Sequence, residues 1–240
     1  AGHRQAFLRA NQLVIRVAIA GAGRMGQAIA AGLDGRDDME LVGFWGRGED
    51  LDALVNAADV VIDFSLPDGT AEVLEAVLRQ GKPLVCGVSG LSDAQVARLD
   101  EVAGQVPLVY DRNMSLGIAV LERSVREAAA SLGADFAVEI SEVHHVHKKD
   151  APSGTALKLG EAIAQARGEQ GTGSASFASE RRGEVPGDHE VVMRSATETL
   201  TFTHSVTSRQ VFADGAVRAG RWIVGQKPGR YTMRDVLFEN

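Results

Sequence analysis

The sequence predicts an α/β protein with a Rossmann-like doubly wound parallel sheet and a second α+β domain with an open mixed sheet. Three observations predict it: short apolar runs alternate with helical segments, a glycine-rich motif joins the first run to the first helix, and this alternation stops near Asn113. Consecutive strands separated by helices need crossover connections, which are typical of parallel sheets.

The strands of the first part are predicted from apolar, largely β-branched runs without polar alternation, a pattern typical of strands buried on both faces. Strands are expected over Val14–Ala20, Leu41–Trp45, Val60–Asp63, Pro83–Cys86 and Pro107–Val109. Helices are expected over Arg24–Leu33, Thr70–Arg79 and Asp93–Val102. Residues 1–12 show no core pattern and are set aside as a frayed end.

The second part begins with a long amphipathic helix, expected over Leu116–Leu132, and a strand with one exposed face, expected over Phe136–Ile140. Antiparallel strands at Val191–Met193 and Leu200–His204, a Gly/Ser-rich mobile loop at Arg167–Ser179 and a helix from Val211 to Ile223 are expected to follow. We therefore expect residues 1–113 and 211–240 to form a dinucleotide-binding domain, and residues 114–210 a substrate-binding and oligomerisation domain.

Composition excludes several classes of protein. The net charge of −7 disfavours general binding to nucleic acid or anionic membranes. The single cysteine, Cys86, excludes an internal disulfide and a multi-cysteine metal site. We see neither a membrane-spanning apolar stretch nor an export leader, so a soluble, cytoplasmic protein is expected.

The motif G-x-G-x-x-G, which lies between a predicted strand and a predicted helix, indicates a dinucleotide site. It reads Gly21-Ala22-Gly23-Arg24-Met25-Gly26. Gly21 permits a tight turn, Gly23 lets the backbone approach a pyrophosphate, and Gly26 lets the helix pack closely on the strand. The helix N-terminus supplies free amides and a partial positive charge.

The end of the second predicted strand indicates cofactor preference. An acidic side chain there accepts hydrogen bonds from the adenosine ribose, whereas an arginine pairs with a 2′-phosphate. Here Gly46-Arg47-Gly48 follows the strand, and no carboxylate stands at these positions. The sequence therefore favours NADPH, with NADH possible.

Three histidines, His144, His145 and His147, lie within four positions and are followed by Lys148 and Lys149. Metal ligation is one hypothesis, because neutral imidazoles bind zinc. However, the two lysines add positive charge, and side chains on an extended segment alternate in direction. An anion pocket with acid–base groups is favoured, and no metal is expected.

The segment that follows the histidines supports the anion pocket. Asp150-Ala151-Pro152-Ser153-Gly154-Thr155 leads into a helix, because proline and small polar residues start helices. The amides of Ser153, Gly154 and Thr155 are then expected to form a carboxylate site at the helix N-terminus.

The motif E-x-H-H-x-x-K-x-D-A-P-S-G-T-A, here Glu142–Ala156, resembles the signature of the 4-hydroxy-tetrahydrodipicolinate reductase (dihydrodipicolinate reductase) family. Further segments that resemble the family, in order, are Ala20–Gly26, Asp63–Pro67, Gly87–Gly90, Asn113–Gly117, Phe212–Ala216 and Pro228–Met233. The resemblance covers nearly the whole chain beyond the first dozen residues. One departure is Gly46, which stands where the family has an acid.

The resemblance implies a homotetrameric reductase of the diaminopimelate route to lysine, which passes a hydride from NADPH or NADH to a cyclic unsaturated dicarboxylate. It implies that His144 is the acid–base histidine and Lys148 the proton donor, and that His145, Gly154 and Thr155, beside Ser153, hold the substrate carboxylate. The cofactor residues implied are Gly21–Gly26, Arg47, Gly87, Val88, Ser89, Asp111, Arg112, Asn113 and Met114.

Two other classes of function stay open. A non-catalytic NADP(H)-sensing binding protein of the same fold would keep the glycine motif without needing the histidine–lysine cluster. An aldehyde dehydrogenase acting through Cys86 would need a basic neighbour for its thiol, and the sequence places none beside it. A serine hydrolase is disfavoured because no G-x-S-x-G motif is present.

Overall fold

The computed structural model describes residues 14–46 and 48–239, which form two compact units. The first unit comprises the described residues up to Asp111 together with Ala213–Val236. The second comprises Arg112–Phe212 and the described residues from Leu237 onwards. Each unit has its own sheet and its own apolar core. Residues 1–12, for which the sequence predicts a frayed end, and Arg47 lie outside the described residues.

The first unit contains a six-stranded sheet whose strand pairs are all parallel. In spatial order the strands are β10 (Gly229–Tyr231), β5 (Pro107–Tyr110), β4 (Leu84–Cys86), β3 (Val60–Asp63), β1 (Ile15–Ala20) and β2 (Met39–Trp45). The order reverses at β1, so the carboxyl ends of β1 and β3 form the topological switch point where α/β proteins bind ligands.

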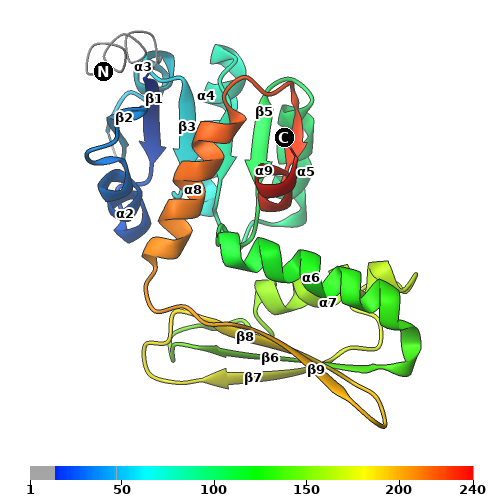
Figure 1. Ribbon diagram of the computed structural model, residues 1–240. Coiled ribbons are helices and arrows are strands. Elements are labelled where there is room, and N and C mark those ends of the chain that lie inside the picture. The colour runs from blue at the N-terminus through cyan, green and yellow to red at the C-terminus, as the bar shows by residue number, and fades with distance from the viewer. Residues whose placement is uncertain (1–13, 47, 240) are drawn as a thin grey trace, which may run out of the picture. The chain divides into compact units, whose positions relative to one another are not determined.

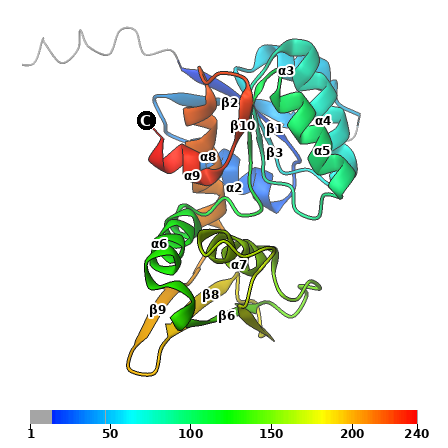
Figure 2. The same cartoon turned by 90° about the vertical axis from the view of Figure 1, so that its right-hand side faces the viewer.

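Helices cover both faces of this sheet, as Figures 1 and 2 show. The helices α2 (Arg24–Leu33) and α8 (Gln210–Ile223) lie on the face that carries Ile19 and Ile62. The opposite face packs against α3 (Leu51–Ala57), α4 (Pro67–Gln80) and α5 (Asp93–Ala103). This arrangement confirms the predicted doubly wound fold. The sequence did not reveal α3, β10 or the short α9 (Met233–Phe238), which are brief segments with little periodicity.

The second unit contains a four-stranded mixed sheet, as the sequence predicts. In spatial order its strands are β7 (Ser176–Arg181), β6 (Ala137–His144), β8 (Asp188–Arg194) and β9 (Thr199–His204). β6 pairs with β7 in parallel and with β8 antiparallel. The prediction of a mobile loop over Arg167–Ser179 is wrong for its last residues. Phe177 packs against the core, and the residues from Ser176 onwards pair with β6.

One face of this sheet is covered by α6 (Leu116–Leu132) and α7 (Gly154–Ala166), which pack on each other (Figure 1). Apolar side chains from both helices and from β6 and β8 form the core between them. A largely buried ion pair joins the helices, with Lys158 Nζ 2.9 Å from Glu122 Oε2. None of the helices within the described residues is long and apolar enough to cross a membrane.

The ion pair between α6 and α7 yields a first prediction. Glu122→Gln removes the negative charge that faces Lys158, and the cost of burying a charged group without its counter-charge is about 1–3 kcal/mol. Urea denaturation followed by circular dichroism should show a free energy of unfolding lowered by this amount. An unchanged unfolding midpoint would mean that the pair does not stabilise the helix packing.

Candidate active site

The carboxyl ends of β1, β2 and β3 lie together at one edge of the first sheet. Backbone hydrogen bonds join their following loops, because Gly21 donates to the Trp45 carbonyl at 3.0 Å and Phe64 donates to the Ala20 carbonyl at 2.9 Å. A cavity of about 660 Å³ opens among these loops and is lined by Gly21, Ala22, Gly23 and Trp45, among others. This is the switch-point position at which the sequence predicts a dinucleotide.

The glycine motif builds the wall of this cavity. Gly21 has a φ of +98°, and a Cβ there would lie 2.6 Å from the Phe64 carbonyl oxygen. A Cβ at Gly26 would lie 1.9 Å from the Gly21 carbonyl oxygen, so only glycine allows α2 to begin so close to β1. By contrast, no heavy atom lies within 4 Å of a Cβ built at Gly23. Gly23 also lacks a side chain to cap α2, which leaves room for a phosphate to accept the first helix amides.

The structure corrects one expectation about the end of β2. The sequence places no carboxylate at positions 46–48, but the side chain of Glu49 folds back and accepts a hydrogen bond from the Gly46 amide at 2.6 Å. Glu49, Asp68 and Glu72 all line the cavity. Carboxylates at this point accept ribose hydroxyls and repel a 2′-phosphate. Arg47, assigned to the cofactor, lies outside the described residues.

The remaining cofactor residues divide between the two units. Gly87 lies against the Phe64 ring, since a Cβ would approach Phe64 Cζ to 2.2 Å. Val88 is buried in the core, so Ser89 is the side chain of this loop left for a ligand. Asp111 is also buried, and its Oδ2 accepts the Met233 amide at 3.2 Å.

Arg112, Asn113 and Met114 belong to the second unit. Arg112 Nη1 lies 3.6 Å from Glu161 Oε1, and Met114 is buried. Asn113 Nδ2 donates to Thr155 Oγ1 at 3.1 Å, which connects it to the start of α7. The structure therefore gives Asn113 a contact beside the predicted carboxylate site.

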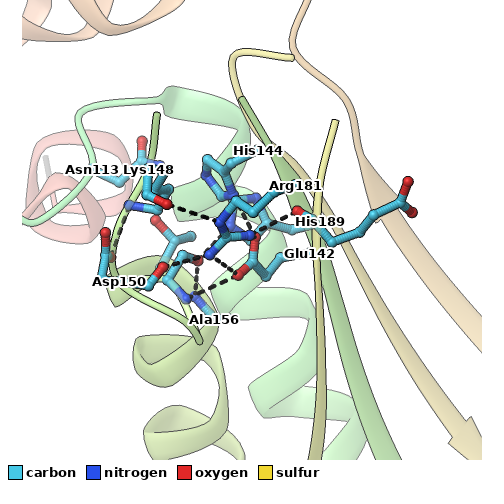
Figure 3. Close-up of polar contacts among 11 residues, drawn as sticks. Asn113, Glu142, His144, Lys148, Asp150, Ala156, Arg181 and His189 are labelled. Carbon is cyan, nitrogen blue, oxygen red and sulfur yellow. Dashed lines mark hydrogen bonds and ion pairs between the residues drawn. The ribbon is translucent and has the colours of Figure 1, made fainter. Parts of the chain in front are cut away.

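A cluster of polar side chains surrounds His144 at the end of β6 (Figure 3). The His144 ring is buried, and its Nδ1 lies 2.5 Å from Glu142 Oε2. Both side chains lie on the same face because they are two positions apart along a strand. Strand register adds Arg181 of β7 opposite His144, and His189 of β8 opposite Glu142.

Lys148 pairs with a carboxylate close to the start of α7. Lys148 Nζ lies 2.8 Å from Asp150 Oδ2. Although burial acts in the opposite direction, Lys148 lowers the pKa of Asp150, and the Gly154 backbone amide lowers it to a smaller extent. Ser153 caps the helix through a hydrogen bond from the Ala156 amide to its Oγ at 3.1 Å. Lys148, predicted from the sequence to belong to the carboxylate pocket, therefore already holds a carboxylate that the chain itself supplies.

The pKa values of this cluster are shifted by burial and by neighbouring charges. Burial lowers the pKa of His144, although the Glu142 carboxylate acts in the opposite direction. Burial also lowers the pKa of His189, to about 3, so this ring is neutral. Burial would raise the pKa of Glu142, but hydrogen bonds from Arg181 and His144 outweigh it and the pKa falls below its ordinary value. Glu142 is therefore ionised at neutral pH.

The other two histidines of the motif do not join His144. His147 is exposed and lies near Glu184, with 3.3 Å between Nε2 and Oε1. The His145 and His147 ring centroids are 6.1 Å apart, and His145 is half-buried. Its pKa is lowered by burial and by Arg209. Within the described part of the chain, no three ligating side chains are grouped so as to hold a metal ion.

Sequence reasoning missed Glu142, Arg181 and His189 as site residues. Glu142 could have been found, because it stands two positions before His144 on a strand and so shares its face. Arg181 and His189 come from later strands, and only the pairing of β7 and β8 with β6 brings them near. Arg181 lies two positions beyond the segment predicted as a loop, on a strand that the sequence did not reveal.

Cys86 does not provide a catalytic thiol. Its side chain is fully buried at the end of β4. Burial and the neighbouring Asp63 raise the pKa of the thiol, so the reactive thiolate is disfavoured. This environment argues against the aldehyde dehydrogenase hypothesis.

A parallel sheet with a glycine-rich loop at its switch point, together with a second unit that carries an acid–base and carboxylate-binding cluster, is typical of two-domain oxidoreductases that use a nicotinamide dinucleotide. Residues 15–114 match the family model described as dihydrodipicolinate reductase, N-terminus. Residues 117–237 match the model described as dihydrodipicolinate reductase, C-terminus. The chain belongs to the dihydrodipicolinate reductase family, which confirms the resemblance noted from its motifs.

Individual relatives agree with this assignment. The chain is 38% identical over 265 residues to 4-hydroxy-tetrahydrodipicolinate reductase of Alkalilimnicola ehrlichii, covering 94% of this chain and 99% of the relative. It is 41% identical over 242 residues to the protein of the same name from Zymomonas mobilis, covering 91% and 95%. The solved structure of dipicolinate-bound dihydrodipicolinate reductase from Paenisporosarcina sp. TG-14 shares the fold, with a TM-score of 0.77, 23% identity and coverage of 92% and 98%.

A pair of glycine variants separates the two functions of the phosphate loop. Gly26→Ala should lower the free energy of unfolding by about 1–3 kcal/mol, because its Cβ meets backbone and the loop must shift. Gly23→Ala should leave stability near that of the wild type but weaken dinucleotide binding, because its methyl group enters open space at the start of α2. Urea denaturation measures the first effect, and fluorescence titration with NADPH measures the second. Unchanged NADPH affinity in Gly23→Ala would contradict this placement of the pyrophosphate.

Proposed function

We propose that this chain reduces 4-hydroxy-tetrahydrodipicolinate to tetrahydrodipicolinate with NAD(P)H, in the diaminopimelate route to lysine. The single observation that carries this proposal is the ion pair of Lys148 with the Asp150 carboxylate, close to the start of α7 and to the buried pair His144 and Glu142. A protein that merely senses NADP(H) has no use for a carboxylate site beside an acid–base histidine. The reductase is therefore the function that the geometry supports best.

The substrate is a dicarboxylate, and the second unit offers fixed charges for it. One substrate carboxylate takes the place of the Asp150 side chain on Lys148 and on the amides of Gly154 and Thr155. Helix α7 contributes the partial positive charge of its N-terminus. Asn113 Nδ2 donates a hydrogen bond to Thr155 Oγ1 at 3.1 Å, and Ser153 caps the same helix turn. Both contacts fix the backbone at this binding site. His145, half-buried on the same loop, adds a further donor to the substrate.

Proton transfer falls to His144 and Lys148. The 4-hydroxyl of the substrate leaves as water, which gives a conjugated ring, and NAD(P)H, when bound, supplies the hydride that reduces a carbon of this ring. The neighbouring carbon becomes electron-rich and must receive a proton from a positioned acid. His144 Nδ1 is bonded to Glu142, so Nε2 is the ring atom able to exchange a proton with Lys148 or the substrate. Lys148 Nζ is proposed as the group that donates the proton to this carbon.

The first unit fits a dinucleotide. The space beside Gly23 admits a pyrophosphate, and the cavity of about 660 Å³ is of the size that ligand pockets have. Gly21–Gly26, the loop of Gly87, Val88 and Ser89, and Asp111, Arg112, Asn113 and Met114 are proposed to contribute contacts to the cofactor. We further propose a homotetramer that works in the cytoplasm, which light scattering and cell fractionation would test.

A coupled assay tests the reaction. Pyruvate, aspartate semialdehyde and the preceding synthase generate the substrate, and absorbance at the nicotinamide band reports its reduction. Wild-type enzyme should oxidise NADPH only when the synthase is present. His144→Ala and Lys148→Ala should each lower kcat by about 10²–10⁴-fold, the usual contribution of a positioned acid–base group. Near-normal turnover in both variants would reject these roles.

Cofactor preference should depend on two residues that act in opposite directions. We propose that Arg47 pairs with the 2′-phosphate and makes NADPH the preferred cofactor, whereas the Glu49 carboxylate limits this preference by favouring a 2′-hydroxyl. The ratio of kcat/KM for NADPH to that for NADH should fall several-fold in Arg47→Ala and rise in Glu49→Gln. If the NADPH-to-NADH ratio of kcat/KM is unchanged in Arg47→Ala, this arginine does not bind the 2′-phosphate.

A further inference from the structure

The Glu142 carboxylate accepts more hydrogen bonds than the carboxylate of a surface ion pair usually does. Its side chain is fully buried. Among the described residues, Oε2 is reached by His144 Nδ1 at 2.5 Å and by Arg181 Nη1 at 2.9 Å, while Oε1 is reached by Arg181 Nη2 at 3.0 Å and by the Ser153 amide at 3.2 Å. A carboxylate has about four lone-pair sites, so these donors can satisfy both oxygens (Figure 3).

Arg181 extends this arrangement to the lysine loop. Besides its two-pronged contact with Glu142, its guanidinium donates to the carbonyls of Lys148 and Asp150. The planar, forked guanidinium suits such simultaneous contacts, which a lysine ammonium would not reproduce. Glu142 and Arg181 together therefore contact the histidine, the lysine loop and the start of α7.

We propose that Glu142, held by Arg181, is the positioning residue that fixes the tautomer and orientation of His144 and, through its second oxygen, the start of the helix that binds the substrate carboxylate. This inference rests on the proposed reductase function and adds a residue to which that function assigns no role. Glu142 acts through its neighbours and does not itself touch the substrate.

The tautomer follows from the chemistry of the contact. An ionised carboxylate only accepts hydrogen bonds, so His144 Nδ1 must carry a hydrogen. The neutral ring then has its lone pair on Nε2, which is the form that can accept a proton and return it. Without Glu142, either nitrogen could carry the hydrogen and the ring could turn. Buried acids that orient a catalytic histidine in this way occur in hydrolases.

The charged and titratable groups that face His144 set the direction of the pH effect. Glu142 on β6 raises the pKa of His144, whereas Lys148 on the following loop and Arg181 on β7 lower it. His189 on β8 packs edge-on, with 5.2 Å between ring centroids, and is neutral. Loss of the Glu142 charge should therefore lower the pKa of His144 further.

The variant Glu142→Gln tests the proposal. Glutamine presents one oxygen and one NH₂ group to neighbours that are all donors, so the NH₂ group meets a donor in either orientation. We expect kcat to fall by about 10²-fold or more, as for loss of an acid–base group. The affinity for NADPH should be unchanged. The fall in activity that follows protonation of His144 at low pH should move to still lower pH, because loss of the Glu142 charge lowers the pKa of His144.

Nuclear magnetic resonance gives a readout that needs no substrate. In protein with ¹⁵N-labelled histidine, wild-type His144 should show a protonated Nδ1 and an unprotonated Nε2 at neutral pH. In Glu142→Gln the two ¹⁵N shifts should move toward the average of two tautomers, and the imidazole should titrate at lower pH. Because this signal comes from the unliganded protein, it tests Glu142 even if the reductase assay shows no activity, in which case the proposed function alone fails.

Two further variants separate positioning from structural damage. Glu122→Gln removes another buried carboxylate of the same unit, and it should lower stability while leaving kcat, the pH profile and the His144 shifts unchanged. Arg181→Lys keeps the positive charge but loses the forked contact, so it should change the His144 shifts in the same direction as Glu142→Gln, to a smaller extent. The proposal is overturned if His144 keeps its tautomer and pKa in both Glu142→Gln and Arg181→Lys, or if Glu122→Gln moves them equally.

Discussion

The ionised carboxylate of Glu142 inside the second unit is the constraint on which the active site depends. Removing a carboxylate from water is costly unless hydrogen-bond donors replace the solvent. Here those donors are the imidazole of His144, the guanidinium of Arg181 and the Ser153 amide. Each donor belongs to a different part of the site. Satisfying one buried charge therefore brings the acid–base histidine and the helix N-terminus together.

The two units divide the chemistry between them. The first unit provides a cavity at the switch point of a parallel sheet, where glycine residues keep side chains out of the space that a pyrophosphate needs. The second unit provides Lys148, which already pairs with the carboxylate of Asp150 close to the start of α7. Under the proposed function, a substrate carboxylate would compete with Asp150 for Lys148.

Much of this could be predicted from the sequence. The strand and helix pattern and the glycine motif identify the first unit because its signals are local and periodic. The segment from His144 to Thr155 identifies part of the candidate site, because its residues lie close together in the sequence. Arg181 and His189 depend on strand pairing between distant segments, which local patterns do not report. Glu49 is the nearest acid after β2 in the sequence, but only the folded loop shows that its carboxylate returns to the Gly46 amide at the end of the strand.

A crystal structure of the enzyme with NADP⁺ and dipicolinate tests the central claim most directly. The account predicts that one dipicolinate carboxylate displaces Asp150 from Lys148 and binds at the start of α7, while the contacts of Glu142 with His144 and Arg181 stay as they are. It would be contradicted by a dicarboxylate bound away from the start of α7, or by a His144 ring turned so that Nδ1 no longer meets Glu142.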